Sequence, residues 1–509
     1  MADWNNQKFA MSMFNGFVPE GIRPWIYLVF AFVFQLSGGI YFGNLSHMVG
    51  ATSLMREDIQ MIAMFGVVGV NMPFPFLFRF KLRFTNRKLL INAAVVIAVC
   101  NVLSLYVTWV PALCLISYVA GFFKLCGTFE CFSNIRLWIS PKQDFGVFLP
   151  TIYIVILGAV PASSWAAQWL TVTLGSWQAM HWLMTAVMLT VVLMVYVLTH
   201  DWRFAKPLPL ISLDWLGCVL WSAVMLEVIW LFTYGEYYNW FQSVRWCQVL
   251  IALPVTLGVT VMRMRRVRHP YIDPKVWPHA RLIPILAMFF VAEMMNATPH
   301  ALQGALTGSV LHWGQATTRN LYVYEFLGYT LGSLFTVLWH RPLHQKYTRL
   351  LTVGFACLLM YQVMMYGYVS PQLNFARLAL PTFLRTFGYA IFFSTMTLYL
   401  KDLIAFPTFF MALTVSGFIR NGVAESICSG LYGYGLRRQI ADTLARGIHP
   451  DFSGVLMVGI KQMWGVLCVV GMLVLLLMML YDVQPVRATM LRMVDVRRVY
   501  RYVSHHLRR

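Results

Sequence analysis

The strongest constraint on this chain is a succession of long apolar runs that continues along most of its length. A helix crosses a bilayer when it holds about 20 predominantly apolar residues. Here 59% of the 509 residues are hydrophobic and only 11% are charged, whereas soluble domains carry about 25% charged residues. So few charges cannot cover a soluble surface. The sequence therefore predicts an all-α polytopic membrane protein.

Hydropathy predicts fourteen membrane-spanning helices with both termini on the cytoplasmic side. The first apolar run, Trp25–Tyr41, is interpreted as a retained span, because it lacks the basic segment and small-residue cleavage site of a signal peptide. The predicted spans lie near residues 24–44, 58–78, 89–108, 111–133, 146–170, 178–199, 213–234, 244–262, 282–306, 320–339, 349–369, 377–400, 407–432 and 456–481.

The charges of the connecting segments support this topology. Basic residues follow every second predicted span, whereas the alternate connections are short and nearly uncharged, as at 107–112 and 171–177. This alternation is typical of basic loops retained on the cytoplasmic face beside anionic lipid. The net charge of +20 is therefore attributed to these loops and not to nucleic-acid binding. The exception is the basic stretch 436–454, which is predicted to be an ordered external loop.

Several stretches beside or within the predicted spans carry motifs. They are Leu174–Trp182, Leu213–Gly217, Gly235–Trp240, His269–Pro274, Leu380–Gly388 and Phe418–Ile427. Together they resemble the fourteen-span drug:proton antiporter branch of the major facilitator superfamily, the EmrB and QacA-like exporters. The resemblance implies a major facilitator fold, in which two six-helix halves flank an inserted helix pair.

The same resemblance implies a division of the chain and a function. The expected parts are an N-terminal half at 1–204, the inserted pair at 205–270, a C-terminal half at 271–484 and a basic cytoplasmic tail at 485–509. The expected function is secondary active export of small, amphipathic or drug-like molecules by alternating access. Proton antiport across the inner membrane would drive it, with no cofactor.

Three motifs of the superfamily are altered in this chain. The basic loop 79–88 lacks the usual glycines and Asp, and the fourth-span stretch Ser117–Gly121 lacks the usual Arg and Gln. Ser37 stands where the first span of that branch carries an Asp. The usual coupling residues therefore cannot be carried over to these two spans.

Ionisable side chains inside the predicted spans are the candidate site residues. Such a residue at the centre of a span costs about 2.5–3.5 kcal/mol on insertion scales and usually faces a cavity or a partner. The candidates for proton coupling are Glu293, His300, Glu325 and Glu425. The candidates for lining the substrate cavity are Lys124, Asn296, Arg385 and Arg420.

The ninth span has the most informative spacing. Glu293, Asn296 and His300 are three and then four residues apart, which places them on one helix face, and Pro299 frees a backbone carbonyl between them. These residues could hold and pass a proton, line the cavity, or form a satisfied polar patch. Lys124 lies seven residues after Ser117 and could replace the missing positive charge or form a structural ion pair.

Other functional classes leave no recognisable pattern. The sequence contains no HExxH, GxSxG or Walker motif and no CxxC pair, so neither an enzyme nor a metal site is expected. The alternative function is a non-transporting or differently coupled membrane protein that kept the fold. Expected partners are the small-molecule substrate and the lipid bilayer. By resemblance, a periplasmic adaptor and a TolC-type outer-membrane channel are also expected.

Overall fold

Helices form almost all of the regular structure, because a chain in lipid must satisfy its backbone hydrogen bonds internally. The computed structural model describes residues 11–38, 40–203, 207, 209–210, 213–276, 282–343, 347–446 and 452–481. Within these ranges, the only β-structure is an isolated bridge between Phe14 and Thr199. The predicted basic tail 485–509 lies outside the described residues.

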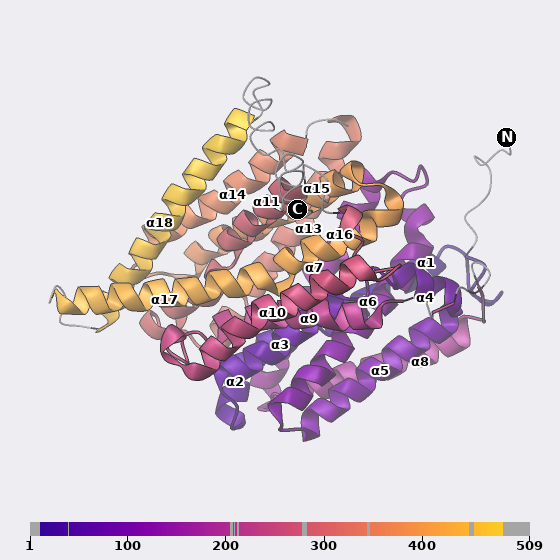
Figure 1. Cartoon of the computed structure of the whole chain (residues 1–509), viewed down its shortest axis with the longest axis horizontal. Helices are drawn as coiled ribbons and strands as arrows, with labels where there is room; N and C mark the ends of the chain where they lie inside the picture. The colour runs from indigo at the N-terminus through magenta and orange to yellow at the C-terminus, as the bar shows by residue number, and fades with distance from the viewer. Residues whose placement is uncertain are drawn as a thin grey trace. The chain divides into compact units, whose positions relative to one another are not determined.

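The chain divides into two compact units, residues 1–213 and residues 214–509. In unit 1, helix α6 packs on α3, α5 and α1, and α5 and α8 lie side by side (Figure 1). The helices of unit 1 are α1 (Arg23–Leu36), α2 (Ile40–Ala51), α3 (Arg56–Asn71), α4 (Leu77–Arg83), α5 (Asn86–Tyr106), α6 (Val110–Ile139), α7 (Phe145–Leu174) and α8 (Ala179–Leu198).

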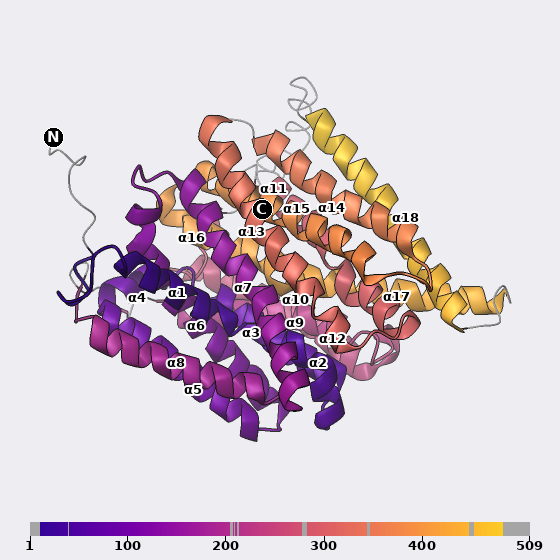
Figure 2. The same cartoon turned by 180° about the vertical axis from the view of Figure 1, so that it is seen from behind.

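In unit 2, helix α15 packs between α13 and α14, as both views show (Figure 1 and Figure 2). The α-helices of unit 2 are α9 (Trp215–Thr233), α10 (Val244–Arg266), α11 (Leu282–Asn296), α12 (Gln315–Thr318), α13 (Leu321–Leu343), α14 (Tyr347–Tyr368), α15 (Phe375–Leu403), α16 (Phe406–Phe418), α17 (Ala424–Ala445) and α18 (Phe452–Tyr481). The short 3₁₀ segments are η1 (Trp240–Gln242) and η2 (Pro274–Val276), and the π-helical segments are η3 (Pro299–Gln303), η4 (Leu306–Val310) and η5 (Ile419–Val423).

Eleven helical stretches of the described chain are long and apolar enough to cross a membrane. They coincide with eleven of the fourteen predicted spans. The other three predicted spans are helical but do not meet this requirement. One is divided between α3 and α4, one lies in α15, and one passes from α16 through η5 into α17. Two of these stretches are interrupted by breaks in the α-helix. In α15, buried polar side chains lower the mean hydropathy.

Residues without bulky side chains allow the closest helix contacts in each unit. A Cβ atom added at Gly121 of α6 would overlap the carbonyl oxygen of Gly66 in α3. In unit 2, a Cβ added at Gly388 of α15 would overlap the carbonyl oxygen of Gly354 in α14. Membrane helices associate through such small residues, because lipid supplies no hydrophobic force to bring them together.

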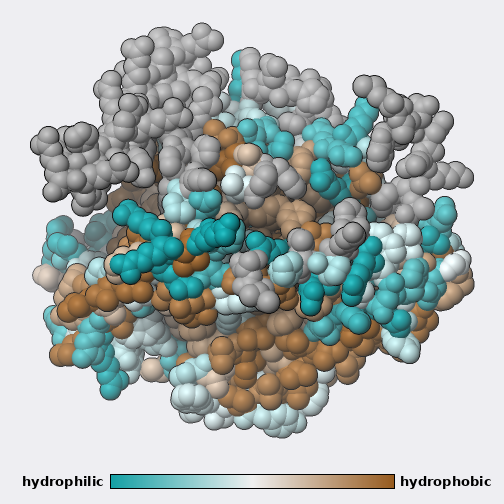
Figure 3. Space-filling model, turned by 45° about the vertical axis from the view of Figure 1, so that its right-hand side comes forward, coloured by the Kyte–Doolittle hydropathy of each residue, from teal (hydrophilic) through white to brown (hydrophobic). Residues whose placement is uncertain are grey.

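Large hydrophobic side chains cover broad areas of the surface (Figure 3). Helix α10 exposes them along its length, for example Ile251 at 67% and Val255 at 63% of their maximal exposure. Such a helix requires an apolar solvent, which agrees with a multi-pass membrane protein. Helices α9 and α10 belong to unit 2 and are joined by an ion pair of 2.7 Å between Arg263 and Asp214. The division into two halves and an inserted pair stays a prediction.

The external loop predicted at 436–454 is wrong for its first ten residues. Helix α17 continues to Ala445, and Arg437 in that stretch forms an ion pair of 2.5 Å with Glu236. Charged residues on exposed helix turns lower hydropathy as strongly as loop residues do, which explains the error. Residues 447–451 lie outside the described part of the chain.

Candidate functional site

Seven of the eight candidate residues lie in unit 2, on helices that contact one another. Helix α11 packs on α14, α15 and α17 and on segment η5. We call these seven residues the polar cluster of unit 2: Glu293, Asn296, His300, Glu325, Arg385, Arg420 and Glu425. The eighth candidate, Lys124, lies on α6 in unit 1.

Two π-helical segments place members of the polar cluster. His300 lies in η3 and Arg420 in η5. Such segments occur frequently at functional sites, because they shift the side chains that follow onto a different helix face. Within η5, Gly422 has a φ of 105°, which glycine adopts without strain and other residues do not. The backbone that holds Arg420 therefore depends on this glycine.

Pro299 explains the end of regular α-helix in α11. Its ring nitrogen has no hydrogen and cannot donate to the carbonyl oxygen of Met295, four residues earlier. The side chain of Gln362, which is fully buried on α14, donates to that oxygen instead at 2.7 Å. The freed carbonyl predicted from the sequence is thus satisfied by a neighbouring helix.

Arg385 on α15 is held by two other members of the polar cluster. Its Nη2 donates to Oε1 of Glu325 on α13 at 2.6 Å, and its Nη1 donates to Oδ1 of Asn296 at 2.8 Å. The guanidinium also lies 5.8 Å from the ring centre of Tyr361. Arg385 is 4% exposed, so the charge-assisted bond to Glu325 compensates a desolvated cation.

Glu293 and Arg420 form a second part of the polar cluster. The Tyr389 hydroxyl donates a hydrogen bond to Oε1 of Glu293, which is 3% exposed. Arg420 stacks over the ring of Phe393 at 4.5 Å from its centre and interacts electrostatically with Glu293. Its Nε and Nη1 atoms are buried and have no hydrogen-bond partner among the described residues. Arg420 therefore keeps donors that a ligand or water could use.

His300 and Glu425 form the third and most exposed part. Nε2 of His300 lies 3.2 Å from Oε1 of Glu425, and their side chains are 54% and 26% exposed. The spacing of Glu293, Asn296 and His300 predicted one common face. Glu293 and Asn296 do contact α15, whereas His300 contacts α17. The π-helical turn that begins at Pro299 changes the register between them.

The tyrosine that completes this site was not predicted from the sequence. Tyr389 is the direct partner of Glu293, and its hydroxyl is the acid's only hydrogen-bond donor from α15 among the described residues. A tyrosine inside a span also serves as an ordinary apolar side chain. The one available signal was its position four residues after Arg385, one turn further along the same helix face.

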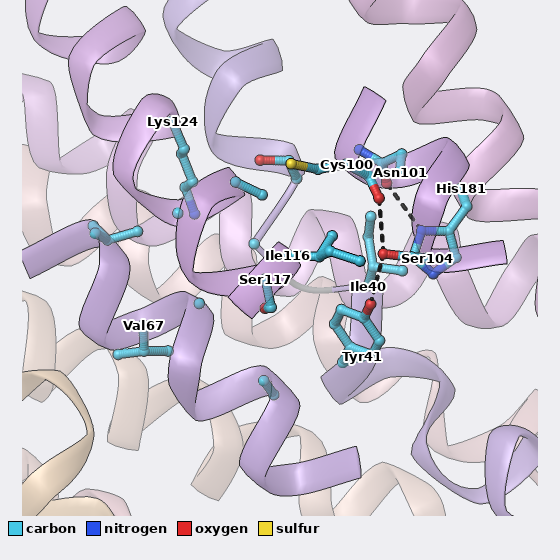
Figure 4. A pocket seen from close by; sticks show the side chains of 17 residues that line it. Ile40, Tyr41, Val67, Cys100, Asn101, Ser104, Ile116, Ser117, Lys124 and His181 are labelled. Atoms are coloured by element: carbon cyan, nitrogen blue, oxygen red, sulfur yellow. Dashed lines mark hydrogen bonds between the residues drawn. The ribbon is translucent and has the colours of Figure 1, made fainter. Parts of the chain in front are cut away.

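Lys124 lines a cavity of about 70 Å³ that lies entirely within unit 1 (Figure 4). Ser37 and Ser117 line the same cavity, as do residues of α2, α3, α5 and α8. The Lys124 side chain is 6% exposed. It makes no hydrogen bond or ion pair with any residue that the structure describes, so the structural ion pair considered for it does not form there.

A polar network, which was also not predicted from the sequence, forms the opposite wall of this cavity. Tyr41 donates to Ser104 at 3.1 Å, and Nδ1 of His181 lies 3.0 Å from Oδ1 of Asn101 (Figure 4). All four residues line the cavity. Asn101 and His181 lie in predicted spans, so the rule that polar residues inside a span face a cavity or partner would have found them.

Glu130 on α6 is paired with a lysine of α4. Its Oε2 lies 3.5 Å from Nζ of Lys81. Burial lowers the pKa of Lys81, and the Glu130 carboxylate offsets part of this shift. Arg136 lies 4.3 Å from the ring centre of Phe145. The Lys81–Glu130 pair joins α4 to α6 and is a structural contact.

The arrangement of helices defines the class of structure, and that class is the major facilitator fold of membrane transporters. An auto-inhibited POT family peptide transporter matches 89% of this chain and 96% of its own, with 15% identity and a TM-score of 0.55. The POT family transporter PepTSo matches 90% of this chain and 98% of its own, with 12% identity and a TM-score of 0.56.

A third solved structure has the same architecture. A mutant of the nucleoside transporter NupG matches 89% of this chain and 98% of its own, with 12% identity and a TM-score of 0.50. At such low identities these similarities establish the fold alone. No model of a known protein family matches the sequence, and no curated protein sequence matches it. The drug:proton antiporter branch therefore stays a prediction.

Proposed function

We propose that this chain is a secondary active exporter of small, amphipathic or drug-like molecules, driven by proton antiport and working by alternating access. The observation that carries the proposal is the charge balance of the polar cluster of unit 2. It contains three carboxyl groups and two guanidinium groups, together with one imidazole. One carboxyl group therefore lacks a permanent positive charge, and one bound proton would balance the cluster.

The contacts favour particular positions for that proton. Glu325 is paired with Arg385 at 2.6 Å, so its carboxylate is already compensated. Glu293 accepts from a neutral tyrosine, and Glu425 faces His300. Proton uptake is therefore assigned to Glu293 or to the His300–Glu425 pair. A proton that binds one conformation more tightly than the other shifts the equilibrium between them, as alternating access requires.

The structural neighbours support transport of small molecules in general. Two of them are described as peptide transporters and one as a nucleoside transporter. Export, proton antiport and the amphipathic class of substrate rest on the motifs of the EmrB and QacA-like exporters. The inner membrane as location, and a periplasmic adaptor with a TolC-type channel as partners, are proposed on the same resemblance.

Proton flux in proteoliposomes tests the coupling directly. Addition of a fluorescent amphipathic dye to vesicles with a pH gradient should cause proton movement with the wild-type chain. Replacing Glu293, Glu325 and Glu425 together by Gln should abolish it. Glu227→Gln is the matched control, because Glu227 is a carboxyl on α9 that accepts from Thr256 at 2.9 Å and lies outside the cluster. Undiminished flux in the triple variant would reject the proposal.

Dye efflux from cells separates the proposal from the non-transporting alternative. Cells that express the chain should lose a preloaded dye faster than cells without it, and an uncoupler should remove the difference. Equal loss in both cell lines, with the chain present in the membrane, would favour the alternative. Efflux that continues unchanged after uncoupling would show a different energy source.

A further inference from the structure

The cavity of unit 1 combines features that the proposed proton coupling does not use. Its volume of about 70 Å³ exceeds the roughly 10–15 Å³ that one water molecule needs by this measure. It can therefore hold several water molecules or one small polar group. No Asp or Glu is among the residues that line it, and Lys124 is the one Lys or Arg among them.

The Lys124 ammonium group is not compensated by the helix end beside it. It lies next to Gly38, just after the C-terminus of α1, where helix carbonyls carry a partial negative charge. Those carbonyls already have donors. Ser37 Oγ donates to Phe34, the Gly38 amide donates to Gln35 and Ser163 Oγ donates to Leu36. The ammonium group is left with no acceptor from the described residues.

The opposite wall has a second unsatisfied polar atom. Asn101 uses its amide group to donate to Ile97, so its Oδ1 accepts from Nδ1 of His181. His181 is only 1% exposed, and its Nε2 atom is buried and has no partner among the described residues. Because Nδ1 carries the hydrogen of this bond, Nε2 of the neutral imidazole can only accept a hydrogen bond. Buried polar atoms normally have partners, so this wall calls for a donor such as water, whereas the Lys124 wall calls for an acceptor.

We propose that this cavity binds a carboxylate group through the ammonium group of Lys124, with Nε2 of His181 on the opposite wall accepting a hydrogen bond from water. The carboxylate belongs to a transported amphipathic molecule whose apolar part extends from the cavity. This assignment deepens the proposed function and rests on it for the identity of the ligand as substrate. Lys124 replaces the charge that the fourth-span motif lacks, and it selects anionic over neutral substrates.

Binding to the purified full-length chain tests the assignment with two probes of equal shape. The probes are 1-naphthoate, which carries a carboxylate, and 1-naphthamide, which is its neutral analogue. A charge-assisted contact in a desolvated site should favour naphthoate by about tenfold. Lys124→Gln should remove this preference, and Lys124→Arg should retain most of it. Equal binding of the two probes to the wild-type chain would overturn the proposal.

A second variant removes the contact without removing the charge. A Cβ atom added at Gly38 would overlap the ammonium nitrogen of Lys124, which can move because it ends a flexible side chain. Gly38→Ala should therefore weaken naphthoate binding severalfold while the protein stays folded. Gly50→Ala is the control, because an added Cβ there has no atom within 4 Å. Equal effects of the two variants would count against the assigned position.

Two further measurements identify the source of the carboxylate and separate the two proposals. If acetate displaces naphthoate at equal concentration, the cavity holds a free small anion and the assignment to substrate is overturned. Proteoliposomes then report transport of both probes. Transport of both without preference leaves the proposed function intact and refutes this inference. Preferential binding of naphthoate without transport of either probe leaves the anion site intact and refutes the proposed function.

Discussion

The ion pair between Arg385 and Glu325 offers the sharpest test of the polar cluster, because substitutions can remove either partner alone or both together. Arg385 is 5% exposed at its side chain and Glu325 is 17% exposed. Removing one partner of a buried pair leaves an uncompensated charge and costs about 3–5 kcal/mol. Replacing both partners by neutral residues of similar size is often close to neutral.

The contacts predict which single variant is more damaging. Glu325→Gln keeps a side-chain oxygen near the guanidinium, and Asn296 still accepts from Arg385 at 2.8 Å. We therefore expect about 3 kcal/mol, the lower end of that range. Arg385→Met leaves the more exposed carboxylate, which water or a proton can compensate, so it should cost less. The double variant should be more stable than Glu325→Gln alone.

Equilibrium unfolding in detergent micelles, followed by tryptophan fluorescence, measures the four free energies of this cycle. A coupling energy above about 1 kcal/mol is expected for residues that share a desolvated hydrogen bond. The matched pair outside the cluster is Lys401, which is half-buried, and Asp402, which is exposed; their charged groups lie 2.9 Å apart. Exposed pairs contribute about 0–1 kcal/mol. Additive effects at Arg385 and Glu325 would show that they do not form the bond.

Two glycine substitutions test the backbone that supports the site. Gly422→Ala should lower the free energy of unfolding by about 1–2 kcal/mol, because alanine is strained at a φ of 105°. Gly308→Ala in the π-helical segment η4 is the control. Equal effects of the two substitutions would show that backbone strain at Gly422 is not the cause. Gly121→Ala should cost about 1–3 kcal/mol by pushing α6 from α3, whereas Gly258→Ala on α10 meets no atom within 4 Å. Unfolding in micelles measures both.

The sequence predicted the helices well where apolar length alone determines them. An uninterrupted apolar stretch such as residues 146–170 has few alternatives in lipid, and α7 covers it as Phe145–Leu174. Prediction failed where helices change geometry. Pro299 indicated a disturbance of the ninth span, whereas the break after Leu36 and the π-helical turn at Ile419 contain no proline. Contacts between helices join residues far apart in sequence and leave no local pattern.

The site shows the same division. Glu293 and Arg385 could be predicted as site residues because charged side chains are rare inside spans, where burying a charge is costly whatever the side chain contacts. Their partners could not be predicted. Tyr389 has an ordinary composition for a span, and only the packing of α11 on α15 brings its hydroxyl to Glu293. Likewise, only the packing of unit 1 shows that Lys124 faces a cavity and has no partner among the described residues.

Ser37 connects the altered motif of the first span to the uncompensated charge in unit 1. It lies at the end of α1 and lines the same cavity as Lys124, next to the glycine that the ammonium group approaches. An acid at this position, as in the exporters that the sequence resembles, would be an acceptor beside the cation. Serine leaves the cation available, which is consistent with a site that takes its negative charge from a ligand.

Ser37→Asp should therefore replace the ligand with a carboxylate of the chain itself. The new pair should raise the free energy of unfolding by about 1–3 kcal/mol, because a buried cation gains its partner. The same variant should lose the preference for naphthoate over naphthamide. Ser37→Asn has nearly the same shape without the charge and should change neither quantity in this way. If Ser37→Asp is no more stable than Ser37→Asn and keeps the preference, then Lys124 already has a partner and the anion site does not exist.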